Sequence, residues 1–396
     1  MKKITTLYLP LILSRISALL TTSSISVSAV FLLFRLHALS PFIVAGISLR
    51  KCVYATFLFL YFVNIFAGAN ALKAQDIHFS QLFETPLLRN PSLAGLFTGD
   101  VRVQSVHRRQ WNSVTIPYET TSLNAEIKLP LSQGGNDFFT VGMQFMYDQA
   151  GSTSFKSTHV LPVVNFHKSI SAEKNKYLSL GFMGGYIART IDRSKITTNN
   201  QWGSGGFDPS APTGETFTNT NYHYWDATLG ATYSSNIGEN DDNNYYVGVA
   251  YHHITRPKVG FYQNSKQVLP TKLVASVGLK YNFAEDSYIT VQADHSRQGP
   301  YRETLAGLMY SMNFVNGIKE TQYTLHVGTY LRWKDAIIPV VKMDYAPFSV
   351  AVSYDANISQ LKPASRGRGG FEVSLSYLAF RDKYNSARDA VRCPKF

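Results

Sequence analysis

Cysteine and charged residues are both scarce in this sequence. Only two of its 396 residues are cysteines, Cys52 and Cys393, which excludes a disulfide-stapled scaffold and a four-cysteine zinc site. Charged residues make up 16%, against about 25% in a typical soluble domain. Aromatic residues nevertheless reach 13%, which argues against a disordered chain. The sequence is also too polar for a bundle of membrane helices, and its abundant tyrosine is typical of strands with one wet face.

Acidic residues are absent from the first 75 positions, which carry seven of the 38 basic residues. The formal net charge of +12 therefore belongs largely to this segment, since the remaining 31 basic and 26 acidic residues give only +5. The rest of the chain also lacks a stripe of lysine and arginine, the electrostatic footprint of a nucleic-acid-binding protein. We therefore expect no nucleic-acid partner.

Residues 49–74 have the pattern of a secretory signal peptide. Arg50 and Lys51 precede an apolar stretch at 53–63, small residues follow at 67–71, and Ala74 precedes Gln75. A membrane-spanning helix is the alternative, because the uncharged run 52–72 is 21 residues long. Residues 1–48 are an extension of doubtful status. Their uncharged run at 16–34 fits either a transmembrane helix or upstream sequence read from a start codon assigned too early.

From residue 75 onward, apolar and polar side chains alternate with a period of two. In 348–355, for example, aromatic and branched residues occupy the even positions and small or polar residues the odd ones. A soluble sandwich would alternate in the same way. Three features favour a transmembrane barrel instead: the signal peptide implies export, the segments are about 9–13 residues long, and the second face is rich in Gly, Ser, Thr, Asn and Gln. About fourteen such segments occur, at 101–107, 119–129, 138–148, 158–168, 177–188, 222–235, 243–254, 271–283, 286–295, 303–314, 320–333, 336–345, 347–356 and 370–380.

The predicted fold is therefore all-β: a transmembrane antiparallel β-barrel of about 14 strands over 101–380 with an N-terminal plug-like segment. With the N-terminus in the periplasm, outer gaps such as 189–221 and 255–270 are on average longer than inner gaps such as 284–285, although the outer gap 334–335 is short. Residues 75–100, rich in turn-forming residues, are a candidate plug or periplasmic segment, with an arm along the barrel wall as the alternative. Residues 381–396 would form a periplasmic tail.

Catalytic and metal-binding motifs are absent from the sequence. It has no G-x-S-x-G nucleophile elbow, no P-loop and no H-E-x-x-H zinc motif. His252 and His253 are adjacent, so on a strand they would point to opposite faces and could not share a metal. We expect neither enzymatic activity nor a cofactor. Aromatic residues near strand ends are expected to form the girdles of a membrane barrel; they are Tyr245, Tyr246, Tyr310, Tyr330, Trp333 and Tyr354.

Several separated motifs agree with those of one family. They are Phe79-Ser80-Gln81, Asn90-Pro91 and Gly95 near the start, then Arg109 and Trp111, then Arg332, Asp335, Ala336 and Pro339, then Ser353-Tyr354-Asp355 and Glu372, and finally Cys393, Pro394 and Phe396. With these motifs in this order, residues 75–396 resemble the PorP/SprF family of outer-membrane proteins of the type IX secretion system in Bacteroidota. Residues 1–48 have no counterpart in that family.

The resemblance implies a multi-pass outer-membrane barrel without enzymatic activity, which supports secretion or cell-surface attachment of adhesin-like cargo, often linked to gliding motility. The partners it implies are outer-membrane lipids, cargo with a C-terminal sorting domain, and periplasmic components of the secretion system. Cys393, Pro394 and Phe396 are candidate docking residues for those components, with a packed C-terminal cap as the alternative. An outer-membrane channel or transporter for small solutes is the alternative function.

Overall fold

The computed structural model describes residues 76–110, 116–131, 136–151, 153–171, 175–215, 219–238, 240–262, 266–316, 320–359 and 367–380. The extension 1–48, the predicted signal peptide 49–74 and the tail 381–396 lie outside the described residues, as do Trp111, Cys393, Pro394 and Phe396. Among the helices that are described, none is long and apolar enough to cross a bilayer.

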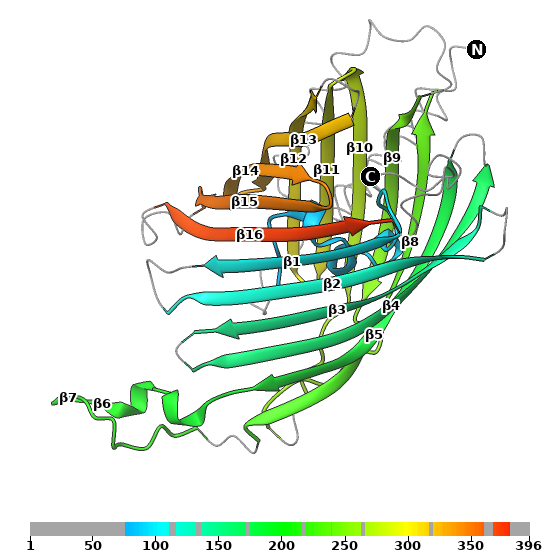
Figure 1. Cartoon of the computed structure of the whole chain (residues 1–396). Coiled ribbons are helices and arrows are strands. Elements are labelled where there is room, and N and C mark those ends of the chain that lie inside the picture. Colours follow the sequence, from blue (N-terminus) through cyan, green and yellow to red (C-terminus); the bar gives the residue numbers. More distant parts are fainter. Residues whose placement is uncertain are drawn as a thin grey trace, which may run out of the picture. The chain divides into compact units, whose positions relative to one another are not determined.

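Fourteen antiparallel strands close into a barrel, in which β1 pairs with both β2 and β16 (Figure 1). The strands are β1 (Val101–Gln110), β2 (Tyr118–Pro130), β3 (Phe138–Ala150), β4 (Phe155–Ser171), β5 (Lys176–Thr190), β8 (Asn221–Ile237), β9 (Asn240–His252), β10 (Lys272–Ala284), β11 (Ser287–Gln298), β12 (Tyr301–Asn316), β13 (Glu320–Arg332), β14 (Ala336–Tyr345), β15 (Phe348–Asn357) and β16 (Arg368–Ala379). Each of the fourteen predicted segments corresponds to one of them, so the predicted barrel is confirmed.

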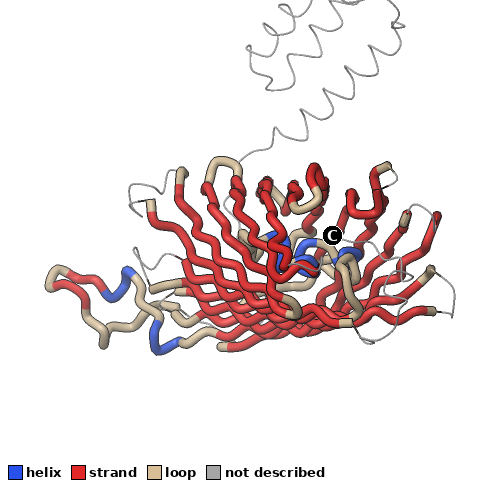
Figure 2. Tube along the Cα trace, turned by 45° about the horizontal axis from the view of Figure 1, so that its top comes forward, coloured by secondary structure: helices blue, strands red, loops and turns tan. Residues whose placement is uncertain are grey.

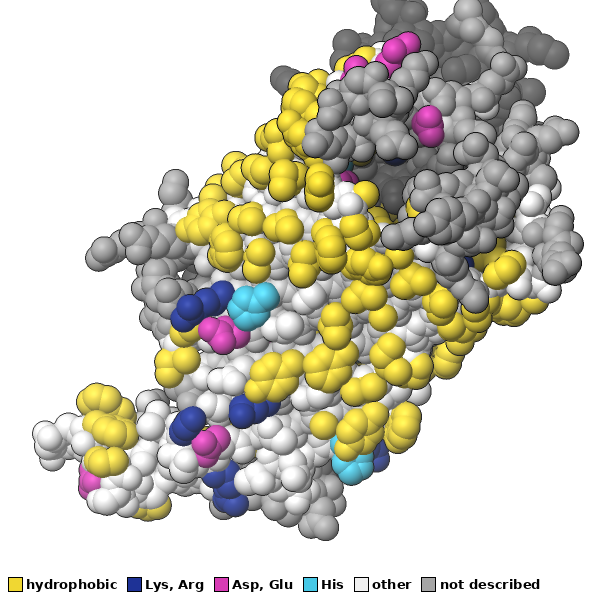
Figure 3. Space-filling view, viewed as in Figure 1, with side chains coloured by type: hydrophobic (Ala, Val, Ile, Leu, Met, Phe, Trp, Pro, Cys, Tyr) yellow, Lys and Arg dark blue, Asp and Glu magenta, His cyan; other side chains and the backbone are white. Residues whose placement is uncertain are grey.

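The strands follow the predicted alternation, with apolar side chains on the outside. On β15, Val350 and Val352 are exposed, whereas Ser353 and Asp355 are buried. Hydrophobic side chains run in rows across the strands that face the viewer in Figure 3. Apolar surface costs roughly 25 cal/mol per Å² in water, so an exposed surface of this kind fits the hydrocarbon core of a membrane.

Two of the tyrosines predicted for the aromatic girdles lie inside the barrel instead. Tyr246 is 1% exposed and Tyr330 is fully buried. Alternation explains the first case, because Tyr245 and Tyr246 are neighbours on β9 and only one of them can face outward. The predicted girdle residues that are exposed are Tyr310, Trp333 and Tyr354.

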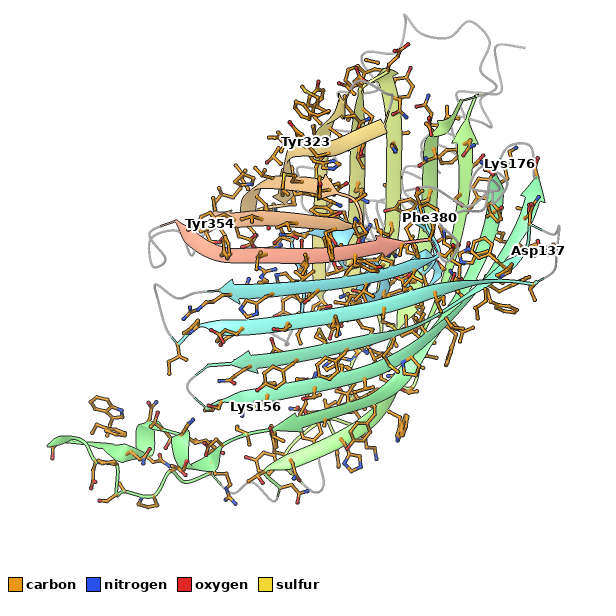
Figure 4. All side chains as sticks on the ribbon, viewed as in Figure 1. Asp137, Lys156, Lys176, Tyr323, Tyr354 and Phe380 are labelled. Atoms are coloured by element: carbon orange, nitrogen blue, oxygen red, sulfur yellow. The ribbon has the colours of Figure 1, made fainter. Side chains whose placement is uncertain are left out.

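The two ends of the barrel differ in the length of their connections. One end carries 131–137, 172–175, 238–239, 285–286, 317–319 and 346–347, whereas the other carries 111–117, 151–154, 191–220, 253–271, 299–300, 333–335 and 358–367. We call the second the outer end and the first the inner end, because outer-membrane barrels carry their longer loops outside the cell. Asp137, Lys176 and Phe380 mark the inner end and Lys156 and Tyr354 the outer end (Figure 4).

The longest connection at the outer end, 191–220, contains short ordered elements of its own. They are η3 (Arg193–Lys195), η4 (Asn199–Gln201) and the hairpin of β6 (Trp202–Gly203) and β7 (Gly206–Phe207). The hairpin extends away from the barrel (Figures 1 and 2). Its indole and phenyl side chains, Trp202 and Phe207, pack against each other and are exposed.

Residues 76–100 form the N-terminal arm, whose helices lie inside the barrel (Figure 2). They are η1 (Leu82–Glu84), α4 (Pro86–Arg89) and η2 (Pro91–Leu93). The last two begin with proline, whose fixed φ suits the first helical position. The Asn90 side chain caps η2 by accepting a hydrogen bond from the Ser92 N–H. Leu82 packs against Leu305 and Met309 of the barrel wall, so the arm also contributes to the apolar interior.

Candidate functional site

Four buried charged side chains from four strands meet in the outer half of the barrel. Arg108 on β1 contacts Asp355 on β15 (Nη2–Oδ2, 2.9 Å) and Glu372 on β16 (Nη1–Oε1, 3.0 Å). Arg332 on β13 contacts the same Asp355 (Nη1–Oδ2, 3.0 Å). None of the four side chains is more than 4% exposed, and we call them the charge cluster. Buried charges are tolerated only when they are paired, so each member depends on the others.

The arm supplies further hydrogen bonds to the charge cluster. The backbone N–H groups of Ser80 and Gln81 donate to the two carboxylate oxygens of Glu372, at 2.7 and 3.0 Å. The Ser80 hydroxyl donates to Asp355 Oδ1 at 2.7 Å and lies 2.5 Å from Arg332 Nη2, which donates to it. Hydrogen bonds to ionised groups are short and strong, so the cluster holds this part of the arm in one position.

His78 lies beside the charge cluster and is neutral. Its backbone carbonyl accepts a hydrogen bond from Arg108 Nη1 at 2.8 Å. Burial lowers the pKa of His78 well below its usual value, and the positive charges of Arg332 and Arg108 lower it further. At neutral pH the imidazole therefore adds no positive charge to the cluster.

Two more ion pairs join the arm to the wall in the middle of the barrel. Arg89 contacts Asp294 through Nε and Nη2, at 2.6 and 2.5 Å, and donates to the Tyr246 hydroxyl at 3.1 Å. Glu84 contacts Lys342 at 3.2 Å. A cavity of about 260 Å³ lies beside these residues and is lined by both the arm and the wall. In each pair one partner belongs to the arm and the other to a strand, so the pairs bind the arm to the wall.

In the inner half of the barrel the backbone of the arm meets the wall at close range. Gly181 and Gly230 face Pro91 and Asn90, and a Cβ atom added at either glycine would overlap the arm. The Asn165 amide donates to two backbone carbonyls of the arm, those of residues 92 and 94, at 2.8 and 2.7 Å. The wall is therefore shaped to fit the arm in this region.

At the outer end, a histidine fixes the first described residue of the arm. His253 Nε2 lies 2.7 Å from Asp76 Oδ2, its Nδ1 contacts Asp226, and Lys272 lies 3.8 Å from Asp76. Burial alone would lower the pKa of His253, but the charges of Asp76 and Asp226 and their hydrogen bonds raise it to about 9. The ring is therefore charged at neutral pH. We call Asp76, Asp226 and His253 the outer latch.

The expectation that His252 and His253 point to opposite faces of a strand is wrong. Strand β9 ends at His252, and His253 has a left-handed φ of 58°. Both rings consequently contact the arm, since His252 Nε2 lies 3.1 Å from the carbonyl oxygen of Arg89. Within the described ranges no group of three or more His, Cys, Asp or Glu side chains is placed to hold a metal ion.

The structure brings most of the motif residues to the contacts between arm and wall. Those at the charge cluster are Ser80, Gln81, Arg332, Asp335, Ser353, Asp355 and Glu372. Those on the inner part of the arm are Asn90, Pro91 and Gly95, and those buried in neighbouring apolar clusters are Phe79 and Ala336. Three others are exposed rather than part of the site: Arg109, Pro339 and Tyr354.

Sequence reasoning missed the ion pairs between the arm and the wall, and it chose the wrong arginine for the charge cluster. Arg109 was selected, whereas its neighbour Arg108 is the buried arginine; Arg109 pairs with Glu119 at 3.2 Å, and both side chains are almost half exposed. The period of two could have found Arg108, because it shares a strand face with Gln104. Arg89 and Asp294 were also missed, and no local pattern marks them.

A model of the family described as type IX secretion system membrane protein PorP/SprF matches residues 71–377. No curated protein matches the chain.

Several solved barrel structures are similar to the chain at low identity. The translocator domain of the autotransporter NalP from Neisseria meningitidis is 12% identical, with a TM-score of 0.36, over 70% of this chain and 88% of that one. A FadL homologue from Pseudomonas aeruginosa is 10% identical, with a TM-score of 0.42, over 78% of this chain and 99% of that one. The CymD monoaromatic hydrocarbon channel is 10% identical, with a TM-score of 0.42, over 78% and 95%.

Proposed function

The chain belongs to the PorP/SprF family of type IX secretion system membrane proteins, and from that premise we propose that it is a non-enzymatic outer-membrane barrel, sealed by its N-terminal arm, that supports secretion or surface attachment of adhesin-like cargo. One observation carries the sealed barrel: the arm lies inside and is bound at the outer end, the middle and the inner half. The cargo role rests on the family.

The way the arm is held argues against free solute flow. A porin lumen is filled with water, which solvates the inward-facing charges. Here, instead, Glu372, Asp294 and Asn165 on the wall bind Ser80, Arg89 and the carbonyl of residue 92 on the arm. Withdrawing the arm would break these hydrogen bonds, and those that involve a charged group contribute about 1.5–3 kcal/mol each. A barrel with a fixed arm suits a binding or coupling role.

Conductance in planar bilayers separates the sealed barrel from the alternative channel. We expect the wild-type protein to conduct little, and a variant lacking residues 76–97 to form a stable open pore, because the fourteen-stranded wall remains closed. The Glu119→Gln variant, changed at an exposed ion pair, is the matched control and should behave as wild type. Steady, solute-selective current through the wild-type protein would support the channel instead.

The cargo role is tested in the native host. A strain lacking the protein should lose large adhesins from its surface, and the first candidate is any large repetitive adhesin encoded beside this gene. Complementation with the wild type should restore display, as judged by surface proteomics and by immunoblotting of the adhesin. Normal adhesin display in the strain without the protein would contradict the proposal, whatever the conductance measurement shows.

We also propose that residues 381–396 dock periplasmic components of the system, with Cys393, Pro394 and Phe396 at the contact. Strand β16 ends at Ala379 at the inner end, which supports a periplasmic position for the residues that follow it. Deleting residues 389–396 should leave the barrel folded, with normal heat-modifiable migration, but impair adhesin display. Unchanged display would remove the docking role, and Cys393→Ser shows whether the thiol itself is needed.

A further inference from the structure

The arm runs through the barrel from the outer end toward the inner end, and its contacts along a single strand show this direction. Strand β16 runs from Arg368 at the outer end to Ala379 at the inner end. Along it, Glu372 accepts from the N–H groups of Ser80 and Gln81, Ser376 donates to Glu84, and the carbonyl of Ala379 accepts from the N–H of Asp100. Residues further along the arm therefore bind positions closer to the inner end.

Two other strands give the same direction. On β11, which ends at the outer end with Gln298, the Gln298 amide oxygen accepts from the Asp76 N–H at 3.2 Å, while Arg89 binds Asp294, deeper inside. On β2, which ends at the inner end with Pro130, Glu126 accepts from the Gly95 N–H and Lys128 donates to the Phe97 carbonyl. Contacts on three strands from different parts of the wall thus give the same direction for the arm.

The start of the arm is fixed beside the long loops of the outer end. His253 is the first residue of loop 253–271 and binds Asp76, and Lys272, just after the loop, lies near the same carboxylate. Loops 191–220 and 253–271 are joined by a hydrogen bond from the Tyr262 hydroxyl to Glu215 Oε2 at 3.0 Å. Short turns lie at the opposite end, where the strand pair β1 and β16 receives the end of the arm.

We propose that the amino end of the mature chain is displayed at the cell surface, held by the outer latch beside loop 253–271, while its carboxyl end leaves the barrel on the periplasmic side. The amino end, expected from the sequence to lie in the periplasm, thus becomes part of the outward-facing surface that is open to secreted proteins. The leader must be removed before the barrel closes, because an uncleaved leader would have to lie on the outer side.

An epitope insertion tests this topology without knowledge of the cargo. A haemagglutinin epitope, which contains no lysine or arginine, is inserted before Asp76 on a flexible linker of about 10 residues, long enough to span roughly 30 Å. We expect antibody to bind it on intact cells. The same epitope placed after Phe396 is the matched control and should be reached only after the outer membrane is permeabilised.

Trypsin distinguishes an arm inside the barrel from an arm lying on its surface. Arg89 is 7% exposed and paired with Asp294, so it should resist trypsin added to intact cells even though the epitope is reached. Epitope binding only after permeabilisation, no binding under either condition, or rapid cleavage at Arg89 on intact cells would each overturn the proposal.

A smaller probe covers the case in which the insertion disturbs assembly. Gln75→Cys in a Cys393→Ser background should react with a membrane-impermeant maleimide on intact cells, and failure to react there would also overturn the proposal. Heat-modifiable migration confirms that each variant is folded. Adhesin display measured in the same strains keeps this result separate from the cargo role, which can fail while the topology holds.

Discussion

The substitution Glu372→Gln is expected to release the arm while leaving the barrel closed. Glu372 is completely buried, contacts Arg108 at 3.0 Å and accepts from the Ser80 and Gln81 N–H groups. A hydrogen bond to a charged group contributes about 1.5–3 kcal/mol. Glutamine removes the charge and keeps one acceptor oxygen for the two arm N–H groups, so we expect a loss of about 3 kcal/mol of docking free energy. This corresponds to a roughly hundredfold larger population of the released arm.

Trypsin cleavage after Arg89 measures that population in purified, detergent-solubilised protein. When the arm opens and closes faster than it is cut, the cleavage rate follows the open population, so Glu372→Gln should be cut roughly a hundredfold faster than wild type. Glu119→Gln is the matched control, because Glu119 pairs with the neighbouring Arg109 while both side chains are almost half exposed. An exposed pair contributes about 0–1 kcal/mol, which allows at most a roughly fivefold change. Equal protection of the two variants would refute the role of the charge cluster.

Three further predictions concern the wall and the outer latch. Val350→Arg should block membrane assembly, because a charge on the lipid face costs up to about 2–4 kcal/mol. Val350→Thr should assemble, and normal heat-modifiable migration of the arginine variant would contradict the assigned facing. Gly230→Ala should loosen the arm by about 1–3 kcal/mol through overlap with Asn90 and speed trypsin cleavage, whereas Gly205→Ala, which meets nothing within 4 Å, should not. The pKa of His253 is raised from 6.5 to about 9, so the latch is fully stabilising below pH 6.5 and is lost as the pH rises through about 9. Above about pH 9, aminopeptidase should therefore trim the amino end faster than below it, once its rate is normalised to that on a free peptide. The His253→Gln variant should lack this pH dependence.

The barrel could be predicted from the sequence because the alternation of apolar and polar residues within each strand shows which face points toward lipid. In β15 the alternation of Val350 and Val352 with Ser353 and Asp355 is sufficient to place one face toward lipid and the other toward the lumen. Tyr246 and Tyr330 were wrongly assigned to the girdles because their residue type was considered without their position in the alternating pattern of the strand. Arg109 was chosen for a different reason, its place in the family motif, although the alternation along β1 places Arg108 on the buried face.

The fixed position of the arm could not be predicted, since no local pattern contains it. Its longest helix, α4, has four residues, too short for a periodic signal. Its contacts join residues far apart in sequence: the Ser80 N–H reaches Glu372, 292 positions away. His253 shows the same limit, because a left-handed φ just after β9 turns its ring toward Asp76, and alternation ceases to apply where a strand ends.

The register of the barrel explains why the motif residues are scattered along the chain yet form one site. Strand β1 pairs with β16 at the seam where the first and last strands meet, and in that register Arg108 lies directly opposite Glu372. The pair that binds Ser80 and Gln81 therefore exists only after the seam has formed. Before closure, Arg108 and Glu372 lie on two separate edge strands, so the arm has no arginine–carboxylate pair to bind. Docking of the arm and closure of the barrel are thus physically linked, and a protected Arg89 reports that both have occurred.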